Sequence, residues 1–173
     1  MKLLPFDRFT LICPKSADEI EAALSPYVSK PKFFEMRLGA FEKPPAQPFQ
    51  GSITREGFKI WPHIRYRNSF LPIVVGGYEP HLSGTKIHVT QRLHVFALGF
   101  AVVWTFLAFG FGGAFVIAPP DPAVDKFLFD PRLVPYLMLF FFWAMAMGGF
   151  WWEARKTPER LSKILDAELD QGF

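Results

Sequence analysis

The sequence predicts an α+β membrane protein: an N-terminal antiparallel β-sheet domain with one covering helix, then a two-helix transmembrane hairpin and a short C-terminal amphipathic helix. Two stretches, residues 95–118 and 133–152, contain no Asp, Glu, Lys or Arg. Since about 20 apolar residues in a helix cross a hydrocarbon layer of roughly 30 Å, each stretch is long enough to span a membrane. Short segments of alternating polarity before residue 92 predict the sheet.

The overall composition conceals this division. Of the 173 residues, 50% are hydrophobic and 20% are charged, and Cys13 is the only cysteine. This hydrophobicity excludes a disordered chain, and a single cysteine excludes a scaffold of intrachain disulfides. Because every charged residue lies outside the two apolar stretches, the chain joins a part of ordinary soluble composition to a membrane part.

These observations divide the chain into five segments. Residues 1–92 form a cytoplasmic α+β domain, and residues 93–118 form the first transmembrane helix. An external loop over residues 119–132 leads to the second transmembrane helix over residues 133–152. A cytoplasmic amphipathic tail follows over residues 153–173.

The first strand and the covering helix carry local signals. A strand is expected over residues 9–13, and Ser16 with Glu19 has the spacing of a capping box that starts a helix. Pro26 shortens or bends the end of that helix. A second strand is expected over residues 33–38, before an extended Pro-rich linker.

A meander of short antiparallel strands follows the linker. Strands are expected over residues 49–54, 58–61, 63–68, 73–78 and 85–91, with a break or bulge at the proline that ends the second one. In the last strand, alternate residues share a face, which predicts one apolar and one polar side of the sheet. The apolar side is formed there by Thr85, Ile87 and Val89, and the polar side by Lys86, His88 and Thr90.

Short motifs in this region resemble those of a group of small bacterial membrane proteins. The resemblance covers roughly residues 49–110 and implies a β-rich domain joined to a helical hairpin in a bacterial membrane. It implies no activity. The motifs are Phe49-x-Gly51-x-Ile53, Phe58-x-Ile60, Tyr66-Arg-Asn-Ser-Phe70-x-Pro72, Gly84-Thr-x-Ile87-x-Val89 and Leu93-His94.

Small residues recur at helical spacing in both apolar stretches and let another helix approach closely. Either the two helices pack on each other, or one small-residue face docks on a partner; large aromatic residues around the first stripe would suit lipid, a neighbouring subunit or a pigment. The predicted helix-packing residues are Ala97, Ala101, Thr105, Ala108 and Gly112 in the first stretch and Ala144 and Gly148 in the second.

The distribution of basic residues predicts the topology. Basic residues flank the outer ends of the two stretches, whereas the connecting loop holds three Asp against Lys126 and Arg132. Basic flanks favour the cytoplasmic side, so both termini are expected in the cytoplasm of a two-pass protein in the bacterial inner membrane. The flanking basic residues are Lys86, Arg92, Arg155, Lys156, Arg160 and Lys163.

Four residues are expected to anchor the helices at the two membrane interfaces. Trp151 and Trp152 would lie at the cytoplasmic interface and Tyr136 near the external one, as in an aromatic belt. His94 stands at the entry to the first helix, as an interfacial anchor or as an axial ligand to haem or chlorophyll.

The N-terminal domain is basic, with 13 Lys and Arg against 8 Asp and Glu in residues 1–94. Five basic residues would converge on a sheet face near the bilayer and bind anionic headgroups, unless they merely form a solvated face. Nucleic acid is not an expected partner, because no binding motif is present. The proposed headgroup ligands are Lys59, Arg65, Arg67, Lys86 and Arg92.

The tail predicts one amphipathic helix, capped by Thr157 with Pro158 in its first turn. This helix would lie on the membrane, pack on the β domain or dock on a partner. Its apolar side consists of Leu161, Ile164, Leu165 and Leu169.

No catalytic, metal or cofactor site is predicted. The sequence has no G-x-S-x-G, phosphate-loop, dinucleotide or HExxH motif. His81 and His88 flank a turn, where they would supply two ligands to a metal or, as the simpler interpretation, be surface residues of the sheet; His63 is expected at the surface. Neither apolar stretch contains an ionisable residue of the kind that proton and ion pathways use.

The sequence therefore favours a non-catalytic accessory or structural subunit of a larger bacterial membrane complex, respiratory or photosynthetic. Its partners would be membrane lipids and other integral membrane subunits. The alternative is a membrane-tethered module whose sheet and helix enclose a lipid or another small apolar ligand. An enzyme is the third and least favoured class.

Overall fold

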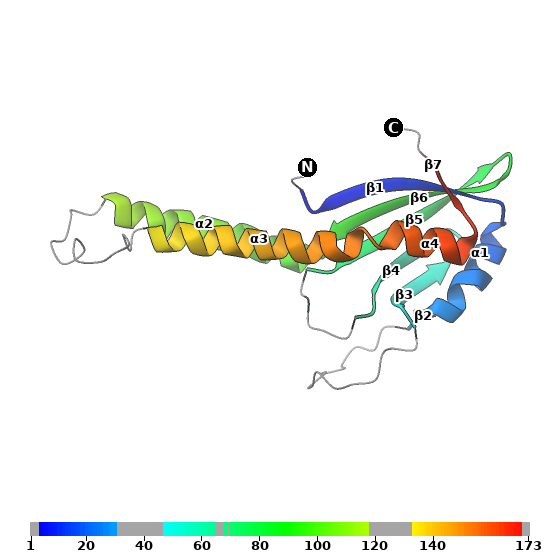
Figure 1. Cartoon of the computed structure of the whole chain (residues 1–173), viewed down its shortest axis with the longest axis horizontal. Helices are drawn as coiled ribbons and strands as arrows, with labels where there is room; N and C mark the ends of the chain where they lie inside the picture. The colour runs from blue at the N-terminus through cyan, green and yellow to red at the C-terminus, as the bar shows by residue number, and fades with distance from the viewer. Residues whose placement is uncertain (1–3, 31–46, 65–67, 69, 118–132, 171–173) are drawn as a thin grey trace. The chain divides into compact units, whose positions relative to one another are not determined.

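A computed structural model of the chain describes residues 4–30, 47–64, 68, 70–117 and 133–170 (Figure 1). The chain divides into two compact units. One, the sheet unit, comprises Met1–His94 and Gly149–Phe173, and the other, the hairpin unit, comprises Val95–Gly148. The α+β class is confirmed, with a seven-stranded sheet and two helices of the length and apolar composition that can cross a membrane.

The seven strands have the order β2-β3-β4-β5-β6-β1-β7. All neighbours are antiparallel except the short parallel pair β2 and β3 at one edge. The first strand of the chain, β1, therefore lies between β6, which precedes the hairpin, and β7, which lies in the C-terminal tail. The strands are β1 (Phe6–Cys13), β2 (Val28–Ser29), β3 (Phe49–Thr54), β4 (Gly57–Pro62), β5 (Pro72–His81), β6 (Gly84–Leu93) and β7 (Glu168–Asp170).

One strand expected in the meander is not found at the residues that the structure describes. Of the expected strand over residues 63–68, the described residues His63, Ile64 and Asn68 lie outside any strand. Asn68 instead ties down the connection to β5: its side-chain amide donates to the Gly149 carbonyl, and its Oδ1 accepts from the Phe70 N–H. The strand expected over residues 33–38 lies outside the described residues.

Two helices cover the inner face of the sheet, where the sequence predicted one. They are α1 (Ala17–Leu24), which leads into a 3-10 turn at Ser25–Tyr27, and α4 (Thr157–Leu165). The predicted alternation along β6 is confirmed, because Ile87 and Val89 face these helices and are buried. The core comprises Leu11, Cys13, Ile20, Leu24, Phe49, Phe58, Ile60, Val74, Ile87, Val89, Leu161, Leu165 and Ala167.

The tail helix thus packs on the β domain, one of its three predicted roles. Two details differ from prediction. Thr157 is not the cap; its hydroxyl donates to the Glu153 carbonyl from the first position of the helix. Leu169 is not on the helix, because Asp166 adopts a left-handed conformation (φ 52°) that ends it, and Leu169 lies in β7.

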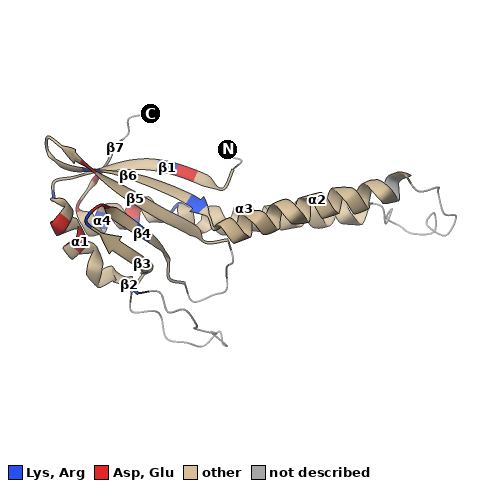
Figure 2. Cartoon of the chain, turned by 180° about the vertical axis from the view of Figure 1, so that it is seen from behind, with Lys and Arg blue, Asp and Glu red and all other residues tan. Residues whose placement is uncertain are grey.

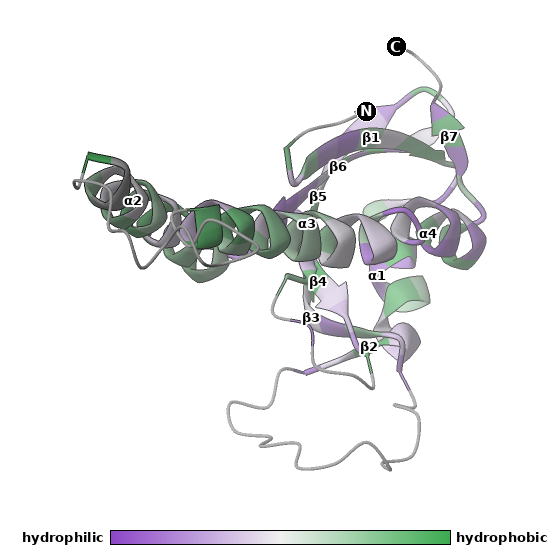
Figure 3. Ribbon diagram, turned by 60° about the vertical axis from the view of Figure 1, so that its left-hand side comes forward, coloured by the Kyte–Doolittle hydropathy of each residue, from purple (hydrophilic) through white to green (hydrophobic). Residues whose placement is uncertain are grey.

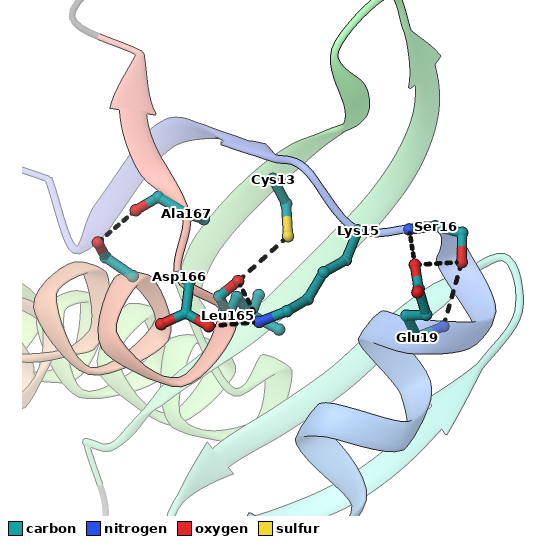
Figure 4. A network of polar contacts seen from close by, with 8 residues as sticks. Cys13, Lys15, Ser16, Glu19, Leu165, Asp166 and Ala167 are labelled. Atoms are coloured by element: carbon teal, nitrogen blue, oxygen red, sulfur yellow. Dashed lines mark hydrogen bonds and ion pairs between the residues drawn. The ribbon is translucent and has the colours of Figure 1, made fainter.

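The segment between β1 and α1 holds the end of α4 in place (Figure 4). Lys15 Nζ donates to the Leu165 carbonyl at 2.9 Å and pairs with the Asp166 carboxylate at 2.6 Å. The Cys13 thiol donates to the same carbonyl at 3.3 Å. Since the last carbonyls of a helix have no partner within it, Lys15 and Cys13 supply one, and the bond to Asp166 raises the pKa of Lys15.

The predicted capping box of α1 is confirmed (Figure 4). The Ser16 hydroxyl accepts from the Glu19 N–H at 3.4 Å, and the Glu19 carboxylate accepts from the Ser16 N–H at 2.7 Å. Hydrogen bonds from Ser16 hold the pKa of Glu19 below its ordinary value.

The hairpin unit is built from α2 (Val95–Ile117) and most of α3 (Val134–Ala154), which run antiparallel. Phe100 packs edge-on against Phe142 near one end, and Phe109 packs against Tyr136 near the other. Figure 3 shows the contrast in hydropathy between these helices and α4, which carries hydrophilic residues on one side. Few residues in the apolar spans of the two hairpin helices are buried.

Candidate functional site

The small-residue stripe of α2 faces α3. Ala101, Ala108 and Gly112 are buried, and Ala97 and Thr105 are half-buried. A Cβ added at Gly112 would lie 2.8 Å from the Tyr136 ring, so glycine permits this close approach. The stripe predicted for this helix therefore packs within the hairpin.

One polar contact joins the two helices at the centre of this stripe. Trp143 Nε1 donates to the Thr105 hydroxyl at 3.1 Å, and that hydroxyl donates in turn to the Ala101 carbonyl at 2.7 Å. The indole N–H is thereby satisfied inside an otherwise apolar interface. Sequence spacing singled out Thr105 as a small residue and missed its hydrogen-bonding role.

The second predicted pair of small residues is oriented differently. Ala144 and Gly148 lie on the exposed side of α3, and a Cβ added at Gly148 meets no atom within 4 Å. This pair therefore makes no packing contact within the hairpin. Within the hairpin unit, Ala146 is a buried small residue of α3. The sequence did not single it out because it belongs to no small-xxx-small pair with its neighbours.

Further small residues lie on the side of α2 away from α3. Gly99, Gly110 and Gly113 occur at spacings that bring them to one face, and a Cβ added at any of them meets no atom within 4 Å. Large apolar side chains surround them. The exposed aromatic residues of the hairpin unit are Phe96, Phe100, Phe106, Phe109, Phe111, Phe140 and Phe141.

The four predicted anchors have different environments. His94 and Trp152 are exposed, and the Trp152 ring stacks with the Lys156 ammonium at 4.8 Å from its centre. Tyr136 is half-buried against Phe109 within the hairpin unit. Trp151 packs with Phe150 in the sheet unit, so His94 and Trp152 are the exposed residues of the four.

Three of the five predicted headgroup ligands lie in the described residues, where they share a face of the sheet but do not form one cluster. By register, Lys59, Lys86 and Arg92 all point to the outer face of the sheet, away from α1 and α4. Lys86 pairs with Asp170 of β7 at 3.3 Å, and it lies six residues before Arg92, a separation of about 20 Å along a strand. Arg65 and Arg67 lie outside the described residues.

A buried polar cluster where α3 meets the sheet was not predicted. Glu153 is only 2% exposed; its carboxylate lies 2.7 Å from Lys156 Nζ and 3.9 Å from the Arg160 guanidinium. The fully buried Gln91 of β6 donates to the Ala154 carbonyl at 3.2 Å. These contacts, with Leu93 packed on Phe150, fasten the end of α3 to the sheet.

In the sequence, the residues of this cluster are distinguished only by where they occur. Glu153 is the first charged residue after the second apolar stretch, and Gln91 is a polar residue on the apolar side of β6. Neither position reveals burial, because that depends on the tail folding back over the sheet.

His63, His81 and His88 lie in different surroundings. His88 pairs with Glu79 at 2.6 Å, whereas His81 lies opposite Gly84 at the end of the strand pair. His63 is half-buried and contacts the Gln50 side chain and the Gln47 carbonyl. Among the described residues, no three His, Cys, Asp or Glu side chains gather as metal ligands.

Tyr78 packs against the core of the sheet unit. The Tyr78 ring packs on Phe58, and burial raises the pKa of its hydroxyl well above the ordinary value. The phenol therefore stays neutral throughout the physiological range and acts as an apolar core residue.

Comparison with known proteins identifies no relative. No family model, curated protein or solved structure matches this chain.

Proposed function

We propose that this chain is a two-pass membrane protein that serves as a non-catalytic accessory subunit of a larger bacterial membrane complex. The hairpin helices would cross the inner membrane, with the sheet unit and both termini in the cytoplasm. Partners would dock on the outward sides of the hairpin, and the sheet unit would supply a further contact surface.

The exposure of the hairpin helices supports membrane insertion. Phe106 is 75% exposed and Phe141 is 68% exposed, and fully exposing such side chains to water costs about 1.5–3 kcal/mol each. A helix of a soluble core would be covered by its own chain, whereas most residues of these helices are not. A hydrocarbon environment removes that cost.

The small residues on the outward sides of the hairpin helices support the proposal of a protein partner. Glycine inside a helix costs about 1 kcal/mol relative to alanine. Yet a Cβ added at Gly99, Gly110 or Gly148 would meet no atom of the described residues within 4 Å, so no neighbour there requires glycine. In membranes, small residues allow a second helix to approach closely. Lipid alone gives no reason for glycine at these positions.

The ligand-binding alternative lacks a supporting observation. Its cavity would be lined by inward residues of the strands, such as Phe49, Ile60 and Ile87. These side chains are buried in one cluster with Leu161 and Ile20 of the covering helices. The inner face of the sheet is thus occupied by the chain itself.

Purification from native membranes in a mild detergent, followed by mass spectrometry of the intact assembly, tests the proposal. A stoichiometric assembly with other integral membrane proteins is the expected result. A monomer that carries only lipid would refute the accessory role.

A matched pair of variants locates the contact. Gly148→Leu places a bulky side chain on the outward side of α3 and is expected to release the partner while leaving the hairpin folded. Met145→Leu, on an outward position that is already bulky and 63% exposed, is expected to retain the partner. Equal retention by both variants would exclude this side of α3 as the docking site.

A further inference from the structure

We propose that the half of the outer sheet face nearest α2 rests on a bilayer surface containing anionic phospholipids, with Arg8, Arg92 and Lys59 facing the headgroups. The inference rests on the proposal that the hairpin spans a membrane, and it assigns anionic phospholipid as the partner of the outer sheet face. It replaces the five-residue cluster predicted from sequence, because Arg8 was not among those residues and Lys86 is engaged elsewhere.

The strand register defines this half of the outer face. It comprises the last residues of β6 and the residues opposite them on β1, β5 and β4. Phe6 and Ile73 lie opposite Arg92, Arg8 and Val75 lie opposite Thr90, and Lys59 lies opposite Val75.

Charge is segregated between the two halves of this face. In the half nearest α2, the residues on these four strands include three basic side chains and no acidic one. Asp7 also lies on β1, but it is in register with the inward-facing Gln91 and belongs to the other face. Figure 2 shows the basic end of β6 at its arrowhead, where the strand leads into the hairpin.

The other half of the outer face carries the acidic residues. Glu79, Glu168 and Asp170 lie there with Lys86 and His88. Ion pairs neutralise much of this charge, since His88 lies 2.6 Å from Glu79 and Lys86 lies 3.3 Å from Asp170. By contrast, none of the described acidic residues forms an ion pair with Arg8, Arg92 or Lys59.

Chain connectivity keeps Arg92 close to the point where α2 would enter the membrane. Arg92 precedes the first residue of α2, Val95, by three residues, which span at most about 10 Å. That distance is about one Debye length at physiological ionic strength, within which a basic residue is attracted to an anionic leaflet. Lys86 is nine residues from Val95, about 30 Å along a strand, and lies beyond this range.

The side chains beside the arginines suit an interface. Phe6 is 39% exposed and Leu4 is 72% exposed, so apolar surface lies next to Arg92. The Arg8 guanidinium stacks over the Phe6 ring at 4.8 Å from its centre. Guanidinium groups bind phosphate through paired hydrogen bonds, while aromatic rings favour the headgroup level. The combination favours a lipid surface over a purely acidic protein partner.

Photocrosslinking in the full-length protein tests the inference. A photoreactive phenylalanine analogue replaces Phe6, and the protein is reconstituted in nanodiscs of phosphatidylcholine alone or with phosphatidylglycerol added. Lipid adducts at position 6 are expected to increase with phosphatidylglycerol. The Arg8→Gln and Arg92→Gln variants should each lower the adduct yield by about fivefold, whereas the Lys86→Gln variant should leave the yield unchanged.

Two control positions show how a lack of adducts at position 6 is to be interpreted. The analogue at Leu82, a fully exposed residue of the turn between β5 and β6, should form no lipid adduct. The analogue at Phe106 reports insertion of α2. Adducts at Phe106 with none at Phe6 would overturn the inference and leave the membrane-spanning proposal intact, and no adducts at either position would overturn both.

Two other results would also contradict the inference. One is an equal yield at Phe6 in both lipid compositions, since charge would then have no effect. The other is an adduct between position 6 and a second protein in native membranes, which would assign this surface to a protein partner. Protection of the buried Cys13 thiol in every variant confirms that the sheet unit remains folded.

Discussion

The two units of this chain treat large apolar side chains in opposite ways. In the sheet unit, Phe49 is fully buried between the sheet and its helices, whereas in the hairpin unit Phe106 is 75% exposed. The first unit satisfies its own hydrophobic surface, as a water-soluble domain does. The second leaves its surface for another medium or another protein to cover.

The polar groups show the same contrast. The sheet unit pairs its buried Glu153 with Lys156 and ends α4 with bonds from Lys15 and Cys13. Between the hairpin helices, the Trp143 indole donates a hydrogen bond to the Thr105 hydroxyl across an interface of mostly apolar side chains. Function is therefore expected on the outward surface of the hairpin and on the outer face of the sheet, since the inner face of the sheet is filled.

The same substitution in the two units gives the largest expected difference. Phe49→Ala should destabilise the sheet unit by about 3–5 kcal/mol, because it leaves a cavity in the core. Phe106→Ala should leave this unit unchanged. Cys13 is the single cysteine of the chain and is fully buried, so its rate of labelling by a thiol reagent measures opening of the sheet unit in the full-length protein. This rate should rise by more than about 100-fold in Phe49→Ala and should not change in Phe106→Ala. Equal rates would contradict the contrast between the units.

The capping box of α1 has a smaller, local effect on the sheet unit. Ser16→Ala removes the bond to the Glu19 N–H and should destabilise the unit by about 1 kcal/mol. The Cys13 labelling rate should rise by about fivefold. Ser25→Ala, which removes an exposed hydroxyl bond to Glu21 at the other end of the helix, is the matched control and should have a smaller effect.

The same capping box predicts that the stability of the sheet unit depends on pH in the acidic range. Because the pKa of Glu19 is held below its ordinary value of 4.5 in the folded protein, its ionised form adds stability above that value. The contribution declines as the pH falls from 4.5 through the lowered pKa. Glu19→Gln keeps an acceptor and loses the charge, so the difference in melting temperature between wild type and variant should shrink across this acidic range. A constant difference would show that the charge of Glu19 does not matter.

The polar contact of the hairpin has the smallest expected effect. Trp143→Phe and Thr105→Val each remove the hydrogen bond between the helices. The coupling energy from the double-mutant cycle should be about 0.6 kcal/mol, as for other interhelical bonds in membranes. Thermal unfolding in detergent measures it. A coupling of zero would show that the indole N–H finds an equally good partner elsewhere.

Much of the fold followed from local patterns in the sequence. Alternation located β3, β4, β5 and β6 within a few residues, and the Ser16–Glu19 spacing located the start of α1. The uncharged stretches located both hairpin helices. These features depend on the period of each element or on a cap, which a single segment encodes.

The features that sequence reasoning missed depend on distant parts of the chain. Three-residue β7 is recognisable only once the turn at Asp166 returns the tail to β1. Burial of Glu153 requires α3 to end against β6. At the described end of the stretch predicted as a strand over residues 63–68, Asn68 lies outside any strand and bonds to Gly149, which lies 81 residues away in sequence.

The site predictions were limited in the same way. Helical periodicity identified the stripe of Ala101, Ala108 and Gly112, but it did not reveal that Ala144 and Gly148 face outward. The basic residues of the sheet were visible individually. Their separation into a basic and an acidic half required the register of β1, β6 and β7.

The most direct test of the central claim is a topology measurement on single-cysteine variants. Cys13→Ser removes the native thiol, and a new cysteine replaces either Leu82 in the sheet unit or Asp125 between the two hairpin helices. In intact inner-membrane preparations, an impermeant thiol reagent should label position 125 from the outside and position 82 only from the cytoplasmic side. Labelling of both positions from the same side would show that the hairpin does not cross the membrane.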